Sequence, residues 1–328
     1  MMKTVNLPRR SLLLAAGLST IGAPSLAQEP FPSKPIRIIV PTPPGGNLDL
    51  VMRALSERLT ASVRQSVIVE NRVGGSSAIG TKYVAQSAPD GYTLIAVGNT
   101  FMSAPAVIPN ISYDPIAEFV GITLICRIPN VLVVPKNSPF RTIQDVINKG
   151  KASPGSISYA SAGGGSVGHF VAENFGNRVG IKMLHVPYKG NGPALIDLVG
   201  GQVDVMFDQV STSSGFIRQG SLRALAVTSS ARASILPGVP TMAEAGLQGF
   251  EDYTINAILA PAATPKYVQA RLLAEITKAL GTSQLRDQFA AQGIELTPSA
   301  SLEEFNAFVK SEVARYATLT RQANIKSD

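Results

Sequence analysis

Short apolar runs rich in β-branched residues alternate with segments of helical periodicity along most of the chain. The first run, 36–40, is followed by a loop and by apolar residues at helical spacing over 48–59. Further strands are expected at 67–69 and 92–97, with a helix at 78–86 between them. Strands that alternate with helices run parallel, because each helix returns the chain to the same edge of the sheet. The sequence therefore predicts an α/β fold.

The alternation restarts after the apolar run 131–134, where a second α/β unit begins. Strands are expected at 157–161, 183–186, 203–207 and 222–227, and helices connect the first of them. Three further helical stretches close the chain, at 265–280, 283–292 and 302–322. A chain of about 300 residues after removal of a leader is long enough for two domains.

The first residues are typical of a secretory signal peptide. Arg9 and Arg10 precede an apolar run, 12–23, that ends at the small-residue pattern Ser25-Leu26-Ala27. This run is far shorter than the roughly 20 residues that cross a bilayer, so we expect export and cleavage near Ala27 instead of anchoring. The choice between the Sec and Tat pathways stays open on these residues.

Charge and ligand chemistry exclude several functions. The predicted signal peptide contains three of the 29 basic residues, so the remaining chain carries +4 in place of +7. Its basic residues are scattered and no aromatic residues interleave with them, so no nucleic-acid groove is expected. The single cysteine, Cys126, cannot form an internal disulfide. Two histidines and one cysteine make no metal-binding cluster, so we expect neither a metal nor a cofactor.

Three loops that follow expected strands are rich in small residues, namely 41–47, 71–77 and 161–166. In parallel α/β sheets, ligands bind at the carboxyl ends of the strands, where free helix N–H groups favour negative charge. Glycine lets the backbone approach a ligand closely, although ordinary turn and capping chemistry explains any one of these loops equally well. Because three loops share this character, they are candidates for an anion site.

Several motifs occur in the order typical of one known family. They are Pro43-Pro44-Gly45-Gly46, Val69-Glu70-Asn71-Arg72, Ala88-Pro89-Asp90-Gly91-Tyr92-Thr93-Leu94, His185-Val186-Pro187-Tyr188-Lys189-Gly190 and Gly200-Gly201-Gln202-Val203-Asp204-Val205-Met206-Phe207. With Leu222-Arg223-Ala224-Leu225-Ala226-Val227-Thr228 and Glu244-Ala245-Gly246, they cover almost the whole mature chain. On these motifs the chain resembles the Bug receptors, the solute-binding proteins of tripartite tricarboxylate transport systems.

This resemblance implies a type II periplasmic binding protein, with two α/β lobes of mostly parallel sheets, a cleft between them, and two crossovers near 126–131 and 249–256. Lobe 1 is expected to comprise 28–128 and 258–328, lobe 2 to comprise 129–257, and 1–27 to be the signal peptide. Such a receptor closes on a small carboxylate-bearing ligand, which can be a di- or tricarboxylate, an aromatic acid or an amino acid. It holds the ligand through backbone amides, hydroxyls and waters, and passes it to a membrane permease. We therefore expect a periplasmic monomer that is not an enzyme.

Carried over residue by residue, the resemblance implies a ligand site with contributions from both lobes. The implied residues are Gly45, Gly46, Asn47, Gly98, Asn99 and Thr100 on lobe 1, and Ser161, Ala162, Ser166, His169 and Asp208 on lobe 2. Thr42 stands where the family usually has an aromatic residue, and Asn47-Leu48 where it has small hydroxyl residues. The identity of the acid therefore cannot be taken from the relatives.

Two motifs in the chain also occur in enzymes. Gly164-Gly165-Ser166-Val167-Gly168 fits the nucleophile pattern of α/β-hydrolases, but no histidine follows Asp208, so the order of a catalytic triad fails. The glycines at 163, 165 and 168 also fit a dinucleotide fingerprint, but the acidic residue expected about 20 positions later is absent. An esterase that uses Ser166 and a ligand sensor for a signalling partner are the remaining alternatives.

Two carboxylates in the candidate loops allow more than one role. Asp49 falls in the first turn of its helix, where it complements the helix dipole and where it would repel an anionic ligand, so a structural role is favoured. Asp208 either contacts an ammonium or hydroxyl group of the ligand or caps the helix that begins near Ser211. His185, inside an apolar strand, is expected to be a core residue.

Overall fold

The structure is a computed structural model that describes residues 1–2, 31–75 and 77–325. The chain divides into two units, Met1–Pro30 and Phe31–Asp328, and all elements described below belong to the second. The predicted signal peptide lies outside the described residues, except for its first two. No helix among the described residues is long and apolar enough to span a membrane.

The first sheet carries the alternation expected from the sequence. Strands β1 (Ile36–Val40), β2 (Val67–Asn71) and β3 (Thr93–Val97) are parallel, with helices α1 (Asn47–Val63), α2 (Ala78–Ala85) and α3 (Asn99–Val107) between or after them. Helix α3 was not predicted, because Pro105 interrupts its sequence pattern. The C-terminal elements α8 (Lys266–Leu280), α9 (Ser283–Ala290), β10 (Glu295–Leu296) and α10 (Leu302–Ala323) complete this lobe.

The second sheet repeats this arrangement. Its parallel strands are β5 (Ser158–Ser161), β6 (Leu184–Pro187) and β7 (Val205–Gln209), and its helices are α4 (Ile143–Ala152), α5 (Val167–Val179), α6 (Asn191–Val199) and α7 (Val210–Arg218). Strand β8 (Leu222–Val227) runs antiparallel beside the strand that enters from the first sheet. The chain therefore has two α/β lobes, as the resemblance implied.

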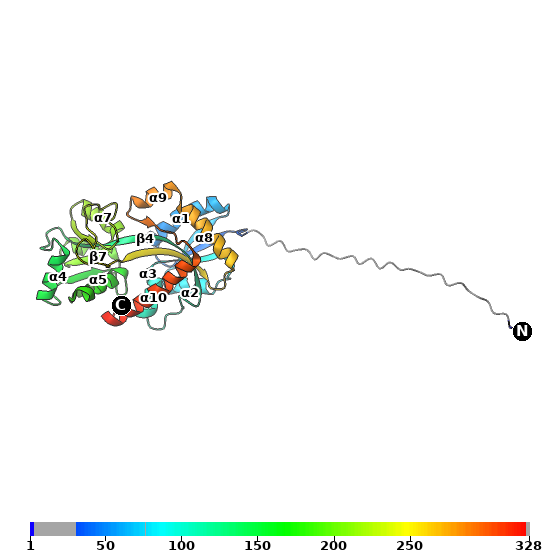
Figure 1. Ribbon diagram of the computed structural model, residues 1–328, viewed down its shortest axis with the longest axis horizontal. Coiled ribbons are helices and arrows are strands. Elements are labelled where there is room, and N and C mark those ends of the chain that lie inside the picture. The colour runs from blue at the N-terminus through cyan, green and yellow to red at the C-terminus, as the bar shows by residue number, and fades with distance from the viewer. Residues whose placement is uncertain (3–30, 76, 326–328) are drawn as a thin grey trace. The chain divides into compact units, whose positions relative to one another are not determined.

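Two long strands join the lobes. Strand β4 (Phe119–Pro135) pairs with β9 (Tyr253–Pro261) as far as Pro129, and from Asn130 onward it pairs with β7 and β8 of the other sheet. Strands β4 and β9 run antiparallel to each other, because β4 carries the chain out of lobe 1 and β9 brings it back. Strand β9 is also antiparallel to its other neighbour, β3. These strands appear in Figure 1 as the ribbons that connect the two groups of helices.

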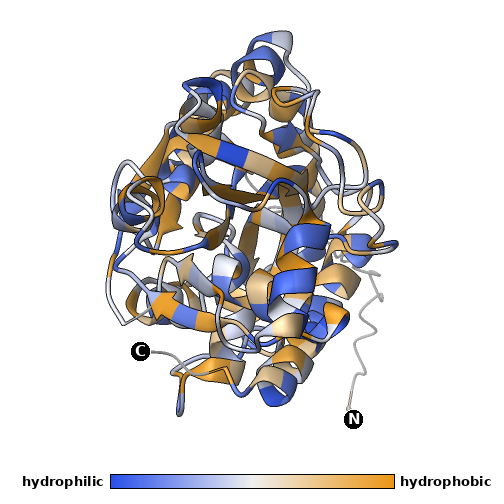
Figure 2. Ribbon diagram, turned by 90° about the vertical axis from the view of Figure 1, so that its left-hand side faces the viewer, coloured by the Kyte–Doolittle hydropathy of each residue, from blue (hydrophilic) through white to orange (hydrophobic). Residues whose placement is uncertain are grey.

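Each sheet is covered by helices on both faces, which gives each lobe two hydrophobic clusters. Figure 2 shows the strands coloured mainly as apolar, while the helices carry both apolar and polar residues. Apolar burial of this kind is the dominant stabilising term in a chain without disulfides. Helix α10 packs against α3 of lobe 1 and α5 of lobe 2, and the Tyr316 ring meets Phe170 edge-on at 4.7 Å.

Candidate ligand-binding site

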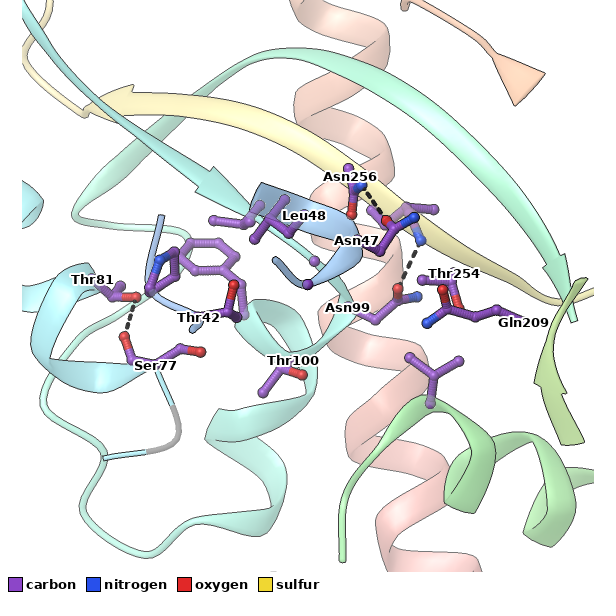
Figure 3. Close-up of a pocket in the computed structure, with 17 residues that line it drawn as sticks. Thr42, Asn47, Leu48, Ser77, Thr81, Asn99, Thr100, Gln209, Thr254 and Asn256 are labelled. Carbon is purple, nitrogen blue, oxygen red and sulfur yellow. Dashed lines mark hydrogen bonds between the residues drawn. The ribbon is translucent and has the colours of Figure 1, made fainter. Parts of the chain in front are cut away.

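Two adjoining cavities lie at the carboxyl ends of the strands, between the lobes. One, of about 240 Å³, is lined mainly by lobe 1, and the other, of about 350 Å³, mainly by lobe 2. They share five lining residues from both lobes, namely Asn47, Thr100, Val167, Gln209 and Thr254. Asn47, Thr100, Gln209 and Thr254 are labelled in Figure 3, which shows the side chains around the first cavity. The two cavities together form one interlobe cleft.

The first glycine-rich loop is held from behind by Asp49. Its carboxylate accepts hydrogen bonds from the Gly45 N–H at 2.9 Å and from Asn71 Nδ2 at 2.8 Å, and it pairs with Arg53 at 3.0 Å. Burial tends to raise the pKa of Asp49, but the hydrogen bonds from Arg53, Gly45 and Asn71 lower it to about 2. Asp49 therefore has a structural role, as its position in the first turn of α1 predicted. The Gly45 N–H donates to Asp49 and not to a ligand in the cleft.

Two asparagines of lobe 1 line the cleft and tie it to the second crossover. Asn47 Oδ1 accepts from Asn256 Nδ2 at 2.7 Å (Figure 3). Asn99 Oδ1 accepts from the Ile255 N–H at 2.8 Å, while its Nδ2 donates to the Tyr253 carbonyl at 3.0 Å and to Tyr316 Oη at 2.9 Å. The side chain of Asn99 is thus hydrogen-bonded to the second crossover and to α10. Only the backbone of Asn99, at the start of α3, is left for the cleft.

Ser161 and His169 of lobe 2 lie beneath the third glycine-rich loop and outside the lining of both cavities. Ser161 is buried, and its Oγ lies 2.6 Å from His185 Nε2. His169 Nδ1 accepts from the Gly165 N–H at 3.1 Å, and its ring stacks on that of His185 with centroids 3.8 Å apart. These contacts fix the path of the loop.

Ser166 and Ala162 line the cavity on the lobe 2 side. Ser166 is the N-cap residue of α5, but its side chain makes no capping hydrogen bond, and its buried Oγ has no partner among the described residues. His169, one turn further along the helix, directs Nδ1 to the Gly165 N–H. Within the described part of the chain, Ser166 therefore lacks the contact between a nucleophile and a base that an esterase requires.

Asp208 lines the same cavity and is almost fully buried. Its carboxylate accepts from Asn191 Nδ2 at 2.7 Å and from the hydroxyls of Thr212 and Ser213 at 2.5 Å each. Burial raises the pKa of Asp208 to about 6, against the lowering effect of the hydrogen bonds from Ser213 and Thr212. Asp208 thus stabilises the first turn of α7, which begins at Val210, and also borders the cleft.

The cleft holds several polar atoms that the protein itself leaves unpaired. Among the described residues, eight buried side-chain polar atoms have no hydrogen-bond partner. Four of them belong to cleft-lining residues, namely Thr42 Oγ1, Asn130 Nδ2, Ser166 Oγ and Gln209 Oε1. A buried polar group without a partner costs about 1–3 kcal/mol, so native proteins rarely keep such groups together without a function.

The N-termini of three helices also border the cleft. Helices α1, α3 and α5 begin after Gly46, Gly98 and Ser166, and none of these residues caps its helix through a side chain. Helix α4, which begins away from the cavities, has a complete capping box at Thr142. Of the residues that the structure describes, those that line the two cavities include no Lys, Arg or His. Backbone N–H groups and neutral side chains are thus the donors that these residues provide.

Of the eleven residues that the sequence placed in the site, the cleft brings together Gly46, Asn47, Gly98, Asn99, Thr100, Ala162, Ser166 and Asp208. Gly45, Ser161 and His169 lie just behind it. The sequence did not point to Asn130, Asn191, Gln209, Thr254 and Asn256, which also line it. Asn130, Thr254 and Asn256 belong to the crossover strands, where no local motif marks a polar residue as functional.

Two α/β lobes, joined by two crossover strands around a polar cleft at the strand ends, define a solute-binding protein of the type II periplasmic binding fold. Residues 51–325 match the family of tripartite tricarboxylate transporter receptors, TctC. The chain belongs to this family, as its motifs suggested. It is 35% identical to BugT of Bordetella pertussis over 98% of this chain and 99% of that protein. It is 38% identical to a protein of the tcbD-tcbE intergenic region of a Pseudomonas species, over 96% of this chain and 94% of that protein.

Solved structures agree with this assignment. The periplasmic binding protein BugD has a TM-score of 0.76 and 33% identity, and the match covers 91% of this chain and all of that one. A Rhodopseudomonas palustris protein solved with adipate has a TM-score of 0.79 and 31% identity, over 90% and 99% of the two chains. MatC from Rhodopseudomonas palustris, solved with bound malate, has a TM-score of 0.75 and 30% identity, over 88% and 99%.

Proposed function

We propose that this chain is a periplasmic receptor that captures a small carboxylate-bearing molecule between its lobes and delivers it to a permease of the tripartite tricarboxylate type. The observation that carries the proposal is the set of four polar atoms in the cleft that have no partner among the described residues, at Thr42, Asn130, Ser166 and Gln209. Groups of this kind regain their hydrogen bonds when a polar ligand or its bridging waters enter.

The same cleft suits an anion without a cationic side chain. A helix N-terminus carries a partial positive charge of roughly half an elementary charge, and its first N–H groups have no partner within the helix. Helices α1, α3 and α5 direct three such ends to the cavities. A carboxylate held by several such donors is neutralised, yet it can leave when the lobes open, as a transport receptor requires.

Within this proposal the candidate residues take two roles. Gly46, Asn47, Gly98, Asn99 and Thr100 would face the ligand from lobe 1, Asn99 through its backbone alone, and Ala162, Ser166 and Asp208 would face it from lobe 2. Gly45, Ser161 and His169 would act indirectly, because they hold the two glycine-rich loops in place.

Lobe closure would bend the chain where the two sheets meet. The pairing of β4 with β9 reaches Pro129, and its pairing with β7 begins at Asn130. A junction of two strands is narrow enough to act as a hinge, a common device in binding proteins. We place lobe 1 at 28–128 and 258–328 and lobe 2 at 129–257, with 1–27 removed on export.

The ligand class is supported by two solved relatives, one determined with adipate and the other with bound malate. Both molecules are dicarboxylates, so an acid with two charged ends is a natural first probe. The permease partner is supported by the name of the family. We expect the receptor to act as a monomer and without a cofactor.

Calorimetry on the protein purified from the periplasm tests the proposal. Titration with malate, adipate, succinate and tricarboxylates, and with aromatic acids and amino acids, should show saturable binding of at least one acid, and the corresponding neutral amide should bind much more weakly. N-terminal sequencing should begin at Gln28. An ester hydrolysis assay run beside the titrations should show no turnover that depends on Ser166. Failure of all organic acids to bind, or hydrolysis that the Ser166→Ala substitution abolishes, would overturn the proposal.

A further inference from the structure

Asn130 occupies the point at which the chain leaves one lobe for the other. It is the first residue of β4 to pair with the second sheet, opposite Gln209, and the residue before it, Pro129, still pairs with Tyr253 of the first sheet. Its exposed fraction is 1%. It also lines the larger cavity of the cleft. Asn130 is therefore both a hinge residue and a cleft residue.

Three of the four polar groups of Asn130 have hydrogen-bond partners in the described part of the chain. Its backbone N–H donates to Thr228 Oγ1 at 3.0 Å, and its carbonyl accepts from the Thr228 N–H at 2.8 Å. Its side-chain Oδ1 accepts from Thr254 Oγ1, on the second crossover, at 3.2 Å. Its Nδ2 has no partner among the residues that the structure describes. Thr254 thus contacts the oxygen of the side-chain amide, while the donor of this cavity-lining residue is unused within the described part of the chain.

We propose that Asn130 is a specificity-determining residue, whose Nδ2 donates to a carboxylate oxygen of the bound acid and so links the ligand to both crossovers. The inference rests on the proposed function, since it needs an acid in the cleft. It adds one contact from the hinge to those from the helix N-termini. Because Thr254 and Thr228 hold the rest of the residue, an acid bound to Nδ2 would connect directly to the β4 and β9 strands that bend on closure.

The substitution Asn130→Asp tests the contact with little change of shape. It retains an oxygen for the Thr254 hydroxyl, removes the donor, and places a negative charge toward the acid. Affinity for the acid that the wild type binds should fall roughly 10- to 100-fold at pH 7.5, as expected for loss of a hydrogen bond to a charged group. Asn148→Asp introduces the same charge at an exposed position of α4 and should leave affinity unchanged.

A pH profile separates a ligand contact from a purely structural role. When the carboxyl group introduced by Asn130→Asp is protonated, it regains a donor and loses its charge. Asp208, which lines the same cavity and has a pKa raised to about 6, titrates over this range in both proteins, so the comparison is made with the wild type at each pH. The affinity deficit of the variant relative to wild type should shrink as pH falls from 7.5 to 5. Asn130→Leu, which offers neither donor nor charge, should lose affinity with no recovery at low pH. Melting of each variant without ligand shows whether it is folded, and the Leu variant serves if the Asp variant is not.

Two results would contradict the inference, and they differ from failure of the proposed function. If the wild type binds malate, adipate or succinate and both folded Asn130 variants bind it equally well, Asn130 makes no ligand contact. If Asn130→Asp loses affinity by the same factor at pH 5 and pH 7.5, its effect is structural and the proposed contact is wrong. If the wild type binds no acid, the proposed function and this inference fail together.

Discussion

The Asp49 carboxylate is expected to be a main stabilising group of the first glycine-rich loop. It accepts from the Gly45 N–H and from Asn71 Nδ2, and Asn71 Nδ2 also donates to the Thr42 carbonyl at 3.0 Å. Neutralising this carboxylate by Asp49→Asn removes the charge that these donors and Arg53 stabilise. The substitution should therefore lower the free energy of unfolding and loosen the loop at the start of α1.

The size of the effect follows from the pKa of Asp49. The group ionises near 3.8 in an unfolded chain and at about 2 in the folded protein. At about 1.4 kcal/mol per pKa unit, the ionised form contributes about 2 kcal/mol to stability. Because the folded-state pKa is lowered, this contribution is complete above about pH 5, falls to about half by pH 3, and disappears as pH drops through 2.

Urea unfolding of the ligand-free protein, followed by circular dichroism, measures the difference. At pH 7 the Asp49→Asn variant should be about 2 kcal/mol less stable than wild type, and the gap should narrow toward pH 3. Glu57→Gln removes one negative charge from an exposed position of the same helix and should change stability little.

An Asp49→Asn variant as stable as wild type at pH 7 would contradict this prediction. A deficit that stays constant between pH 7 and pH 3 would contradict it too, since the loss of stability would then not come from the ionised carboxylate.

Three further predictions concern the cleft and the core. Gly168→Ala should cost about 1–3 kcal/mol and weaken acid binding, because the new Cβ would lie 2.7 Å from the Phe207 carbonyl oxygen. Gly192→Ala, at the same position of α6 with open space around it, should melt like wild type; equal melting of both variants would contradict the expected clash. Burial raises the pKa of Asp208 to about 6, so ionisation of this carboxyl should destabilise the fold by about 3 kcal/mol as pH rises from 3 to 7. The free energy of unfolding of Asp208→Asn should fall by about that much less than that of the wild type over this range, while Asp252, whose pKa is also raised to about 6, contributes equally to both proteins. Cys126 is fully buried, and burial raises the pKa of its thiol to about 12, so a thiol reagent should label it only after denaturation; rapid labelling of the native protein would contradict this.

The strand and helix order of the protein is largely readable from its sequence, because hydrophobic periodicity is a local property. Strand β1 and helices α1 and α8 follow the expected residues closely. Helix α3 was not predicted from the sequence, because Pro105 breaks the helical pattern. Of the 17-residue strand β4, only the apolar run 131–134 and a crossover near 126–131 were expected, because Pro129 interrupts its pattern. Both elements depend on partners far away in the chain.

Some residues of the candidate site can likewise be found from the sequence, and others cannot. Its glycine-rich loops, helix starts and Ser166 can be found from the sequence, since glycine and small polar residues after a strand indicate where a backbone can approach a ligand. The roles of Asn99 and Ser161 could not be found in this way. The side chain of Asn99 is bonded to the second crossover, and Ser161 lies under a stacked histidine pair.

The alternating α/β pattern, the glycine-rich strand ends and the family all follow from the order of the residues. The folded chain was needed to show which polar atoms of the described residues remain unpaired in the cleft, and that Asn130 lies at the junction of two sheets. The physical reason is that periodicity and turn chemistry act over a few neighbouring residues. Whether a buried amide finds a hydrogen-bond partner depends on side chains that are distant in sequence, such as Thr228 and Thr254 around Asn130.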